Sequence, residues 1–363
     1  HPHARIITRN AAAARDVSGV HGVFFAEDVP GTNLIGPIFH DEPLLAEDEV
    51  FYVGQAVALV VGETYDACRA GAALVEVTYE PLPALLSIPQ AIEADSYLTD
   101  AHVIQRGDVD TAIAAAETVI SGEVSNGAQD HFYLETQVSL AVPQEADAMH
   151  VYSSSQHPTE VQKMVAAVLG SGAKDVVCEV QRMGGAFGGK ESQATQYACL
   201  AALAAQALGR PVKVWLNRDD DMTITGKRHP FWSRYTAGFD AQGRITALKV
   251  EIYADGGFPI DLSGPILDRA LFHIDNSYYL PNLYFSGRAL RTNLPSNTAF
   301  RGFGGPQGML VVEDAIHRYC ETAGLDPLEI RTLNYYGATP RNRAPYGQEI
   351  KDCRLDRVTE ELL

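Results

Sequence analysis

Residues 183–191 read Met-Gly-Gly-Ala-Phe-Gly-Gly-Lys-Glu, and residues 297–308 read Asn-Thr-Ala-Phe-Arg-Gly-Phe-Gly-Gly-Pro-Gln-Gly. Glycine has no Cβ, so a run of glycines lets backbone N–H groups come within hydrogen-bonding distance of a bulky ligand. Each run also contains aromatic and charged side chains, which can hold a flat polar molecule. A helix is predicted after each run, and the N-terminus of a helix favours oxyanions. The two stretches therefore predict a binding surface formed by two loops.

Nucleotide binding is the familiar alternative for such loops. The spacing from Gly184 to Lys190 fits the GxxxxGK pattern of a phosphate-binding loop, but the next residue is Glu191. A nucleotide-binding loop needs Ser or Thr there to ligate magnesium, and a carboxylate would repel phosphate. Neither run contains GxGxxG, so nothing indicates a Rossmann dinucleotide site. The alternative to a binding surface is that the two runs are ordinary turns between a strand and a helix.

Composition narrows the class of protein. The 363 residues are 46% hydrophobic and 20% charged, which is typical of a soluble globular chain with room for two domains. No apolar run is long enough to span a membrane. The formal net charge of −18 argues against nucleic acid or an anionic membrane surface as a partner. The five cysteines lack CxxC spacing, which argues against zinc, iron–sulfur ligation and disulfides, so we expect a cytoplasmic protein.

The sequence pattern predicts an α+β fold, because antiparallel strand pairs and helices alternate without βαβ regularity. A small α/β domain is expected at residues 1–95, a linker at 96–105 and a larger mixed α+β domain at 106–363. Residues 50–61 are expected to form one long strand with a glycine break at Gly54. Other expected elements are strand pairs at 136–142 with 149–153 and 231–239 with 245–253, and helices from Pro158, at 192–208 and from Pro306.

Four strings of this sequence resemble the molybdenum hydroxylase family: residues 129–135, 184–191, 269–276 and 292–308. The resemblance is strongest to the molybdenum-binding subunit of bacterial xanthine dehydrogenases, and it spans essentially the whole chain. It implies a hammerhead-like first domain and the first part of a molybdopterin-binding domain. One departure is Ala186, where the family usually has a third glycine.

The resemblance also implies a reaction. The family hydroxylates an electron-poor ring carbon with water as the oxygen source, here converting hypoxanthine and xanthine to urate. The cofactor would be molybdopterin, whose molybdenum carries sulfido, oxo and hydroxo ligands and needs no direct protein ligand. Electrons would leave through 2Fe-2S clusters and FAD in a partner subunit to NAD, within an (αβ)2 assembly.

The family subunit is longer than this chain, so the rest of the molybdenum subunit is expected to complete the site. The general base is implied to be a glutamate in a Gly-Glu-Pro-type string, and the 363 residues contain no such string. We therefore expect residues 1–363 to be inactive alone. Two alternatives stay open: a subunit that oxidises aldehydes or other N-heterocycles, and a non-catalytic assembly fragment.

Four residues are implied to hold the cofactor. The Gln156 amide would contact the oxo group of the molybdenum without binding the metal itself. The region of Phe187 and Gly188 would bring backbone N–H groups to the metal. Arg301 would hold the pterin. On their own, a glutamine at a helix entry is usually a cap or a solvent residue, and Arg301 could instead pin its loop to nearby carbonyls.

Three residues are implied to bind and orient the substrate. Phe303 would stack on its ring, while Glu191 and Arg269 would face each other across it as catalytic groups. A purine presents N–H donors and carbonyl acceptors around its rim, so opposite charges on its two sides can orient it. Aldehyde-oxidising relatives are implied to have uncharged residues at these two positions. The alternatives are simple core packing for Phe303, and for Glu191 a salt bridge with Lys190 or a charge at a helix N-terminus.

Overall fold

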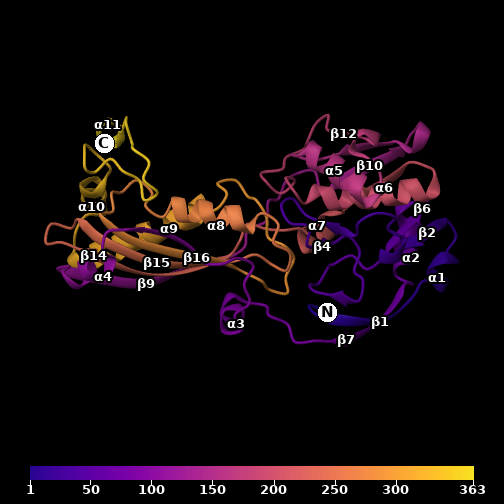
Figure 1. The fold of residues 1–363 in the computed structure, drawn as a ribbon, viewed down its shortest axis with the longest axis horizontal. Coiled ribbons are helices and arrows are strands. Elements are labelled where there is room, and N and C mark those ends of the chain that lie inside the picture. Colours follow the sequence, from indigo (N-terminus) through magenta and orange to yellow (C-terminus); the bar gives the residue numbers. More distant parts are fainter.

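Two lobes lie side by side in the computed structural model, which describes residues 1–363 (Figure 1). The chain crosses between them repeatedly. Residues 1–81 and about 129–227 build the lobe that contains the N-terminus, and the remaining residues build the lobe that contains the C-terminus. Helices and antiparallel strand pairs are mixed in both lobes, which confirms the α+β prediction.

The N-terminal segment forms three small sheets. Strand β1 (Ala4–Asn10) lies between β5 (Glu49–Val50) and β7 (Glu76–Pro81), while β2 (Val20–Phe24) pairs with β6 (Leu59–Gly62) and β3 (Leu34–Ile35) with β4 (Glu42–Pro43). Helices α1 (Ala12–Arg15) and α2 (Tyr65–Ala72) complete the segment. The prediction of one strand at 50–61 was wrong. Gly54 has φ +100°, and the Gln55 side chain accepts the Phe51 N–H at 2.8 Å, so a local turn separates two short strands.

The second sheet of this lobe has the order β12-β11-β10-β13. Its strands are β10 (Val138–Pro143), β11 (Met149–Ser153), β12 (Val176–Glu179) and β13 (Val212–Trp215). The predicted hairpin is confirmed by the antiparallel pairing of β10 with β11. Three helices belong here: α5 (Pro158–Val168), α6 (Ala194–Leu208) and α7 (Arg218–Ile224). Nearly all of α6 is buried, because it packs against this sheet and against β2, and Ile35, Leu44 and Val61 of the N-terminal segment share its core.

The other lobe is built on a five-stranded sheet of order β8-β16-β15-β14-β9. Its strands are β8 (His102–Arg106), β9 (Thr118–Asn126), β14 (Phe231–Phe239), β15 (Ile245–Asp255) and β16 (Asn282–Leu290). Its helices are α3 (Ile88–Glu93), α4 (Val109–Ala114), α8 (Ser263–Phe272), α9 (Gly305–Ala323), α10 (Pro327–Asn334) and α11 (Leu355–Leu362). The predicted linker at 96–105 includes most of β8, which is a strand because it finds its partner β16 far along the chain. None of the helices is long and apolar enough to cross a membrane.

The two glycine runs lie at the junction of the lobes. The first run follows β12 and leads to α6 in one lobe, and the second follows β16 and leads into α9 in the other. The repeated crossing of the chain is therefore what brings the two runs together.

Candidate cofactor and substrate site

The two glycine runs are in direct backbone contact. The Arg301 N–H donates to the Phe187 carbonyl at 2.9 Å. Gly188 has φ +104°, and a Cβ added there would lie 2.6 Å from the Ala299 oxygen. Only glycine allows this approach, because an alanine would clash with the backbone of the other run. The pair of loops predicted from the sequence is thus one continuous surface.

Gly188 offers a sharp test of this contact, with Gly209 as a matched control. Gly209 also has positive φ, at +63°, but nothing lies within 4 Å of an added Cβ. We expect Gly209→Ala to lower the free energy of unfolding by about 1 kcal/mol from backbone strain, and Gly188→Ala by roughly 2–3 kcal/mol because the clash adds to the strain. Chemical denaturation of the full-length variants measures both losses. Equal losses would show that the two runs do not press on each other at Gly188.

His131 lies between the two runs. Its Nε2 is 2.6 Å from the Ala299 carbonyl oxygen, and its ring stacks on Phe300 with centroids 4.6 Å apart. On its other side, a Cβ added to Gly189 would lie 2.6 Å from the ring. His131 is therefore a positioning residue that joins both loops. Sequence reasoning assigned it no role, although it lies in the 129–135 string that carries the family resemblance.

Burial lowers the pKa of His131 to about 4, against the opposing effect of its hydrogen bond to the Ala299 carbonyl. The ring is therefore neutral, with Nε2–H as the donor to that carbonyl. In the unfolded chain its pKa is about 6.5. Between about pH 6.5 and pH 4 only the unfolded state binds this proton, so stability falls as pH falls through this window.

We expect the His131 contribution to the free energy of unfolding to be complete above about pH 6.5 and to fall by roughly 1.4 kcal/mol per pH unit below it, until about pH 4. Residue-resolved histidine hydrogen exchange on the full-length protein measures the ring pKa directly. A His131→Gln variant should lack this component of the pH dependence of unfolding. A measured pKa near 6.5 would contradict the buried, neutral ring.

The buried side chain of Lys190 anchors the first glycine run. This side chain is fully buried, and Nζ donates to Glu135 at 3.1 Å and to Ser154 at 2.8 Å. Glu135 also accepts the Gly184 N–H at 3.0 Å, so one carboxylate ties both ends of the run. Burial raises the pKa of Glu135, but these hydrogen bonds outweigh it and leave the pKa below its usual value. Lys190 is thus paired with Glu135, and the alternative of a salt bridge to Glu191 is not what the structure shows.

Gln156 lies beside the first run with an exposed side chain. Its Oε1 accepts the N–H of Gly188 at 2.9 Å and of Lys190 at 3.4 Å, and it is His157 that stands at the N-cap of α5. The Gly188 N–H is therefore already bonded, which differs from the expectation that it points at the metal. The Gly188 N–H is not free to meet the metal because the side-chain oxygen of Gln156 accepts its hydrogen bond. Its Nε2 makes no hydrogen bond within the chain and is available as a donor.

Arg301 is exposed, and its guanidinium makes no hydrogen bond or ion pair within the chain. The second loop is pinned instead by Arg228, whose Nη2 donates to the Arg301 carbonyl at 2.9 Å. The Arg228 guanidinium also lies 3.9 Å from the centre of the Phe300 ring. Arg301 is therefore free to meet an anionic ligand.

The two candidate aromatic residues differ in their surroundings. Phe187 is 48% exposed, whereas Phe303 is half-buried and packs partly against the core of the C-terminal lobe. Both have positive φ, +55° for Phe187 and +50° for Phe303. Such a conformation is uncommon for a bulky residue and is held by the surrounding glycines. Core packing of Phe303 is thus partly observed, and the side chain remains partly exposed.

Arg269 stands in the last turn of α8, with an exposed side chain that has no partner in the chain. The second glycine run packs directly on this helix. A Cβ added to Gly304 would lie 2.1 Å from the Ile266 oxygen, and one added to Gly308 would lie 2.1 Å from the Ala270 oxygen. These two glycines let α9 seat on α8, which places the run beside Arg269.

The predicted residues thus fall in two groups, each on or beside one of the two glycine runs, whose backbones are in contact. One group comes from the N-terminal lobe and comprises Gln156, Phe187, Gly188 and Glu191; the other comes from the C-terminal lobe and comprises Arg269, Arg301 and Phe303. Glu191 is half-buried, its N–H donates to the Gly188 carbonyl at 3.1 Å, and its carboxylate has no ion-pair partner within 4 Å. An unpaired carboxylate and two unpaired guanidiniums are suited to bind charged and polar groups of a ligand.

Comparison with known proteins identifies the family of this chain. Residues 93–335 match the family described as "Molybdopterin cofactor-binding domain", and residues 1–83 match "Aldehyde oxidase and xanthine dehydrogenase, a/b hammerhead domain". The chain is 42% identical over 361 residues to xanthine dehydrogenase of Dictyostelium discoideum and 44% identical over 365 residues to xanthine dehydrogenase 1 of Arabidopsis thaliana. These matches cover 99% of this chain, but only 26% and 27% of the relatives.

Solved structures of molybdenum hydroxylases have the same fold as this chain. The aldehyde oxidoreductase of Desulfovibrio gigas superposes with a TM-score of 0.92 at 30% identity, covering 99% of this chain and 41% of that one. The aldehyde oxidoreductase of Desulfovibrio desulfuricans gives 0.94 at 26% identity, covering 100% and 42%. The chain therefore belongs to the aldehyde oxidase and xanthine dehydrogenase family of molybdenum hydroxylases. It contains the family's molybdopterin cofactor-binding domain.

Proposed function

We propose that this chain is the first part of the molybdenum-binding subunit of a xanthine dehydrogenase, which hydroxylates hypoxanthine and xanthine to urate with water as the oxygen source. The observation that carries the proposal is the pair Glu191 and Arg269, two charged side chains without protein partners. Glu191 ends the first glycine run, and Arg269 stands on α8, against which the second run packs. Opposite charges suit the donors and acceptors on the rim of a purine. The identity of 42–44% to xanthine dehydrogenases supports the same substrate class.

The residues at the site fit molybdopterin. The free Nε2 of Gln156 can donate to an oxygen of the cofactor, and the free Arg301 guanidinium can pair with its anionic groups. The glycines let the two runs pack closely on each other and on their neighbours, which places Gln156 and Arg301 at one surface. When bound, molybdopterin supplies the redox chemistry and the activated water.

The chain's own residues bind and orient the substrate. Phe303 presents an aromatic ring on which a flat heterocycle can stack, an interaction of roughly 0.5–1.5 kcal/mol beyond burial. Glu191 accepts hydrogen bonds from ring N–H groups, and Arg269 donates to a ring carbonyl on the other side. Because these groups come from two loops held by His131 and Lys190, their spacing is set before the substrate arrives.

Further groups are needed to complete a turnover. We propose that electrons pass through 2Fe-2S clusters and FAD of a partner subunit to NAD, in a cytoplasmic (αβ)2 assembly. The general base and the remaining pterin contacts would come from the rest of the molybdenum subunit. The chain spans about a quarter of the length of the two xanthine dehydrogenases named above, whose remaining sequence is long enough to contain such parts.

The whole assembly tests this function. We expect the purified complex to contain molybdenum, iron and FAD and to reduce NAD when given xanthine, and residues 1–363 alone to retain no stoichiometric molybdenum after gel filtration. Metal analysis and the optical spectrum measure cofactor content independently of activity. A loaded complex that is inactive on purines would contradict the proposal, and stoichiometric molybdenum on residues 1–363 would show that one wall of the site suffices.

Oxidation of aldehydes or other N-heterocycles is the second candidate. It is favoured by the solved structures, since both of those named above are aldehyde oxidoreductases. Competition between xanthine and an aromatic aldehyde for the same complex separates the two. A complex that prefers the aldehyde would establish this candidate instead.

A further inference from the structure

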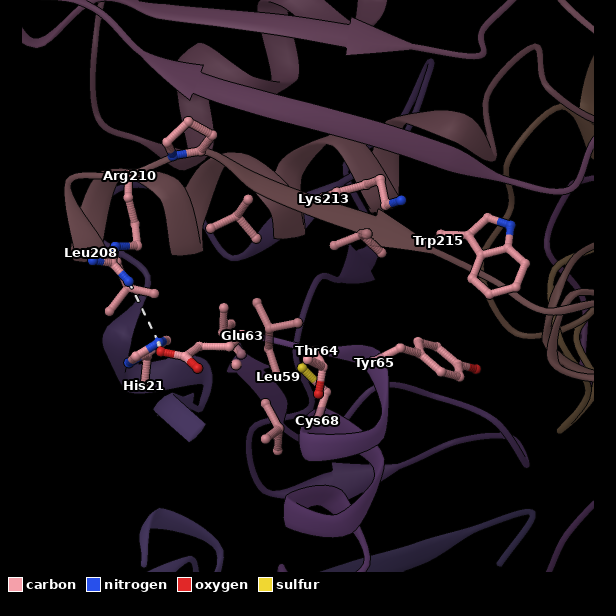
Figure 2. Close-up of a pocket in the computed structure, with 16 residues that line it drawn as sticks. His21, Leu59, Glu63, Thr64, Tyr65, Cys68, Leu208, Arg210, Lys213 and Trp215 are labelled. Atoms are coloured by element: carbon pink, nitrogen blue, oxygen red, sulfur yellow. Dashed lines mark hydrogen bonds and ion pairs between the residues drawn. The ribbon is translucent and has the colours of Figure 1, made fainter. Parts of the chain in front are cut away.

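A groove separates two open strand edges in the N-terminal lobe (Figure 2). Strand β6 pairs only with β2, and β13 pairs only with β10 at the end of its sheet. All residues of both strands line the groove. The edge of each strand that faces the groove therefore has no hydrogen-bonded partner strand. Unpaired strand edges present rows of backbone N–H and C=O groups that pair readily with another strand.

The groove has an apolar floor, and interacting side chains stand at its two ends. Leu59, Leu208 and Val214 lie along it as half-buried side chains that belong to the edge of the neighbouring core. At one end His21 lies 3.3 Å from Glu63, and at the other end the rings of Tyr65 and Trp215 lie with centroids 5.4 Å apart. The rims are labelled in Figure 2, with Lys213 and Trp215 on β13 and Leu59 and Glu63 on the opposite side.

Two unpaired strand edges on either side of an apolar floor favour an extended peptide as the ligand of the groove. A strand rises about 3.3 Å per residue, so the four-residue edges match a segment of about four or five residues. Such a segment could satisfy the unpaired backbone groups with its own, while every second side chain contacts the apolar floor. A compact ligand would leave the backbone edges without partners.

We propose that the occupant is an extended segment of the same polypeptide that lies outside these 363 residues, added as a strand between β6 and β13. The solved aldehyde oxidoreductases superpose on 99–100% of this chain with only 41–42% of their own residues, so more than half of each of those chains lies outside the part that superposes. A segment of the same chain also has a high effective concentration at the groove. The inserted strand would join the β2-β6 pair and the four-stranded sheet into one continuous sheet.

Photocrosslinking in the full-length protein tests the occupant. Position 213 on β13 would carry p-benzoylphenylalanine in place of Lys213, and the control would carry it in place of Val177 on β12, the opposite edge of the same sheet, which is 54% exposed. We expect the probe at position 213 to yield a crosslink within one polypeptide, to a peptide outside the 363 residues. The probe at position 177 should not yield that crosslink. Crosslinks only to a second copy or to another protein, or no crosslink at all, would overturn the proposal.

Backbone hydrogen exchange of the unmodified full-length protein gives a second readout. If a strand is inserted, amides of β6 and β13 that face the groove should exchange at least about 100-fold more slowly than loop amides. Exchange at loop rates on both strands would overturn the proposal. The result is separable from the proposed function: protected strands in a protein inactive on xanthine would count against the function alone, and an active enzyme with unprotected strands would count against the groove alone.

Discussion

Replacing Glu191 by alanine in the full-length enzyme should lower kcat/KM for xanthine by roughly a hundredfold to a thousandfold. A positioned hydrogen-bonding group of this kind is worth roughly 2.7–4 kcal/mol in transition-state stabilisation. Glu191 has no ion-pair partner in the chain, and Lys190 beneath it is already paired with Glu135, so its removal leaves no protein group unsatisfied. The loss should therefore appear in turnover and not in folding.

Steady-state kinetics normalised to active molybdenum measure the Glu191→Ala effect. Glu191→Gln is the matched control, because it keeps the size and one acceptor but removes the charge, and it should lie between the wild type and the alanine variant. Molybdenum content should match the wild type in both. If Glu191→Ala oxidised xanthine at the normal rate, Glu191 would have no role in binding the substrate.

Replacing Arg269 by methionine should separate purine from aldehyde substrates. Attack on the purine pushes negative charge onto its ring, and a guanidinium facing a ring carbonyl stabilises that charge as it develops. An aldehyde does not spread charge that far and gains little from the same group. We therefore expect Arg269→Met to lower kcat/KM for xanthine at least about a hundredfold more than for a small aromatic aldehyde, or about 2.7 kcal/mol in the ratio.

Both substrates should be measured at one pH on the wild type, Arg269→Met and Arg269→Lys. The lysine variant keeps a charge but loses the planar fork, so it should recover part of the preference for xanthine. Arg269 is exposed at the end of α8 and its side chain makes no hydrogen bond or ion pair in the chain, so the protein should remain stable. Equal losses on the two substrates would instead mean that Arg269 supports the shape of the pocket.

Local signals in the sequence determined individual elements well. The start of α5 at Pro158, the helix predicted at 192–208 and the start of α9 near Pro306 form as expected, because each depends on a few neighbouring residues. The 231–239 and 245–253 strand pair is confirmed for the same reason. The family itself was identifiable because its glycine runs are long, ordered strings with a demanding backbone conformation.

In other places the local sequence pattern did not predict the structure, because the structure depends on partners far along the chain. Strand β8 lay in a predicted linker because its only partner, β16, is far along the chain. The predicted second domain divides between two lobes, and the N-terminal segment shares a core with α6, which no composition change along the chain reveals. The predicted domains follow the order of the chain, whereas each lobe is built from segments that lie far apart in the chain.

At the site, the sequence by itself determined which residue types are present, and only the tertiary structure decided which atoms are free. Lys190 and Glu191 are adjacent in sequence, but one is buried against Glu135 and the other has no partner. The Gly188 N–H is taken by Gln156, and His131 joins the two loops through the Ala299 carbonyl. These outcomes depend on contacts between segments far apart in the chain, because each polar group bonds to whichever partner the packing of the two lobes brings within reach.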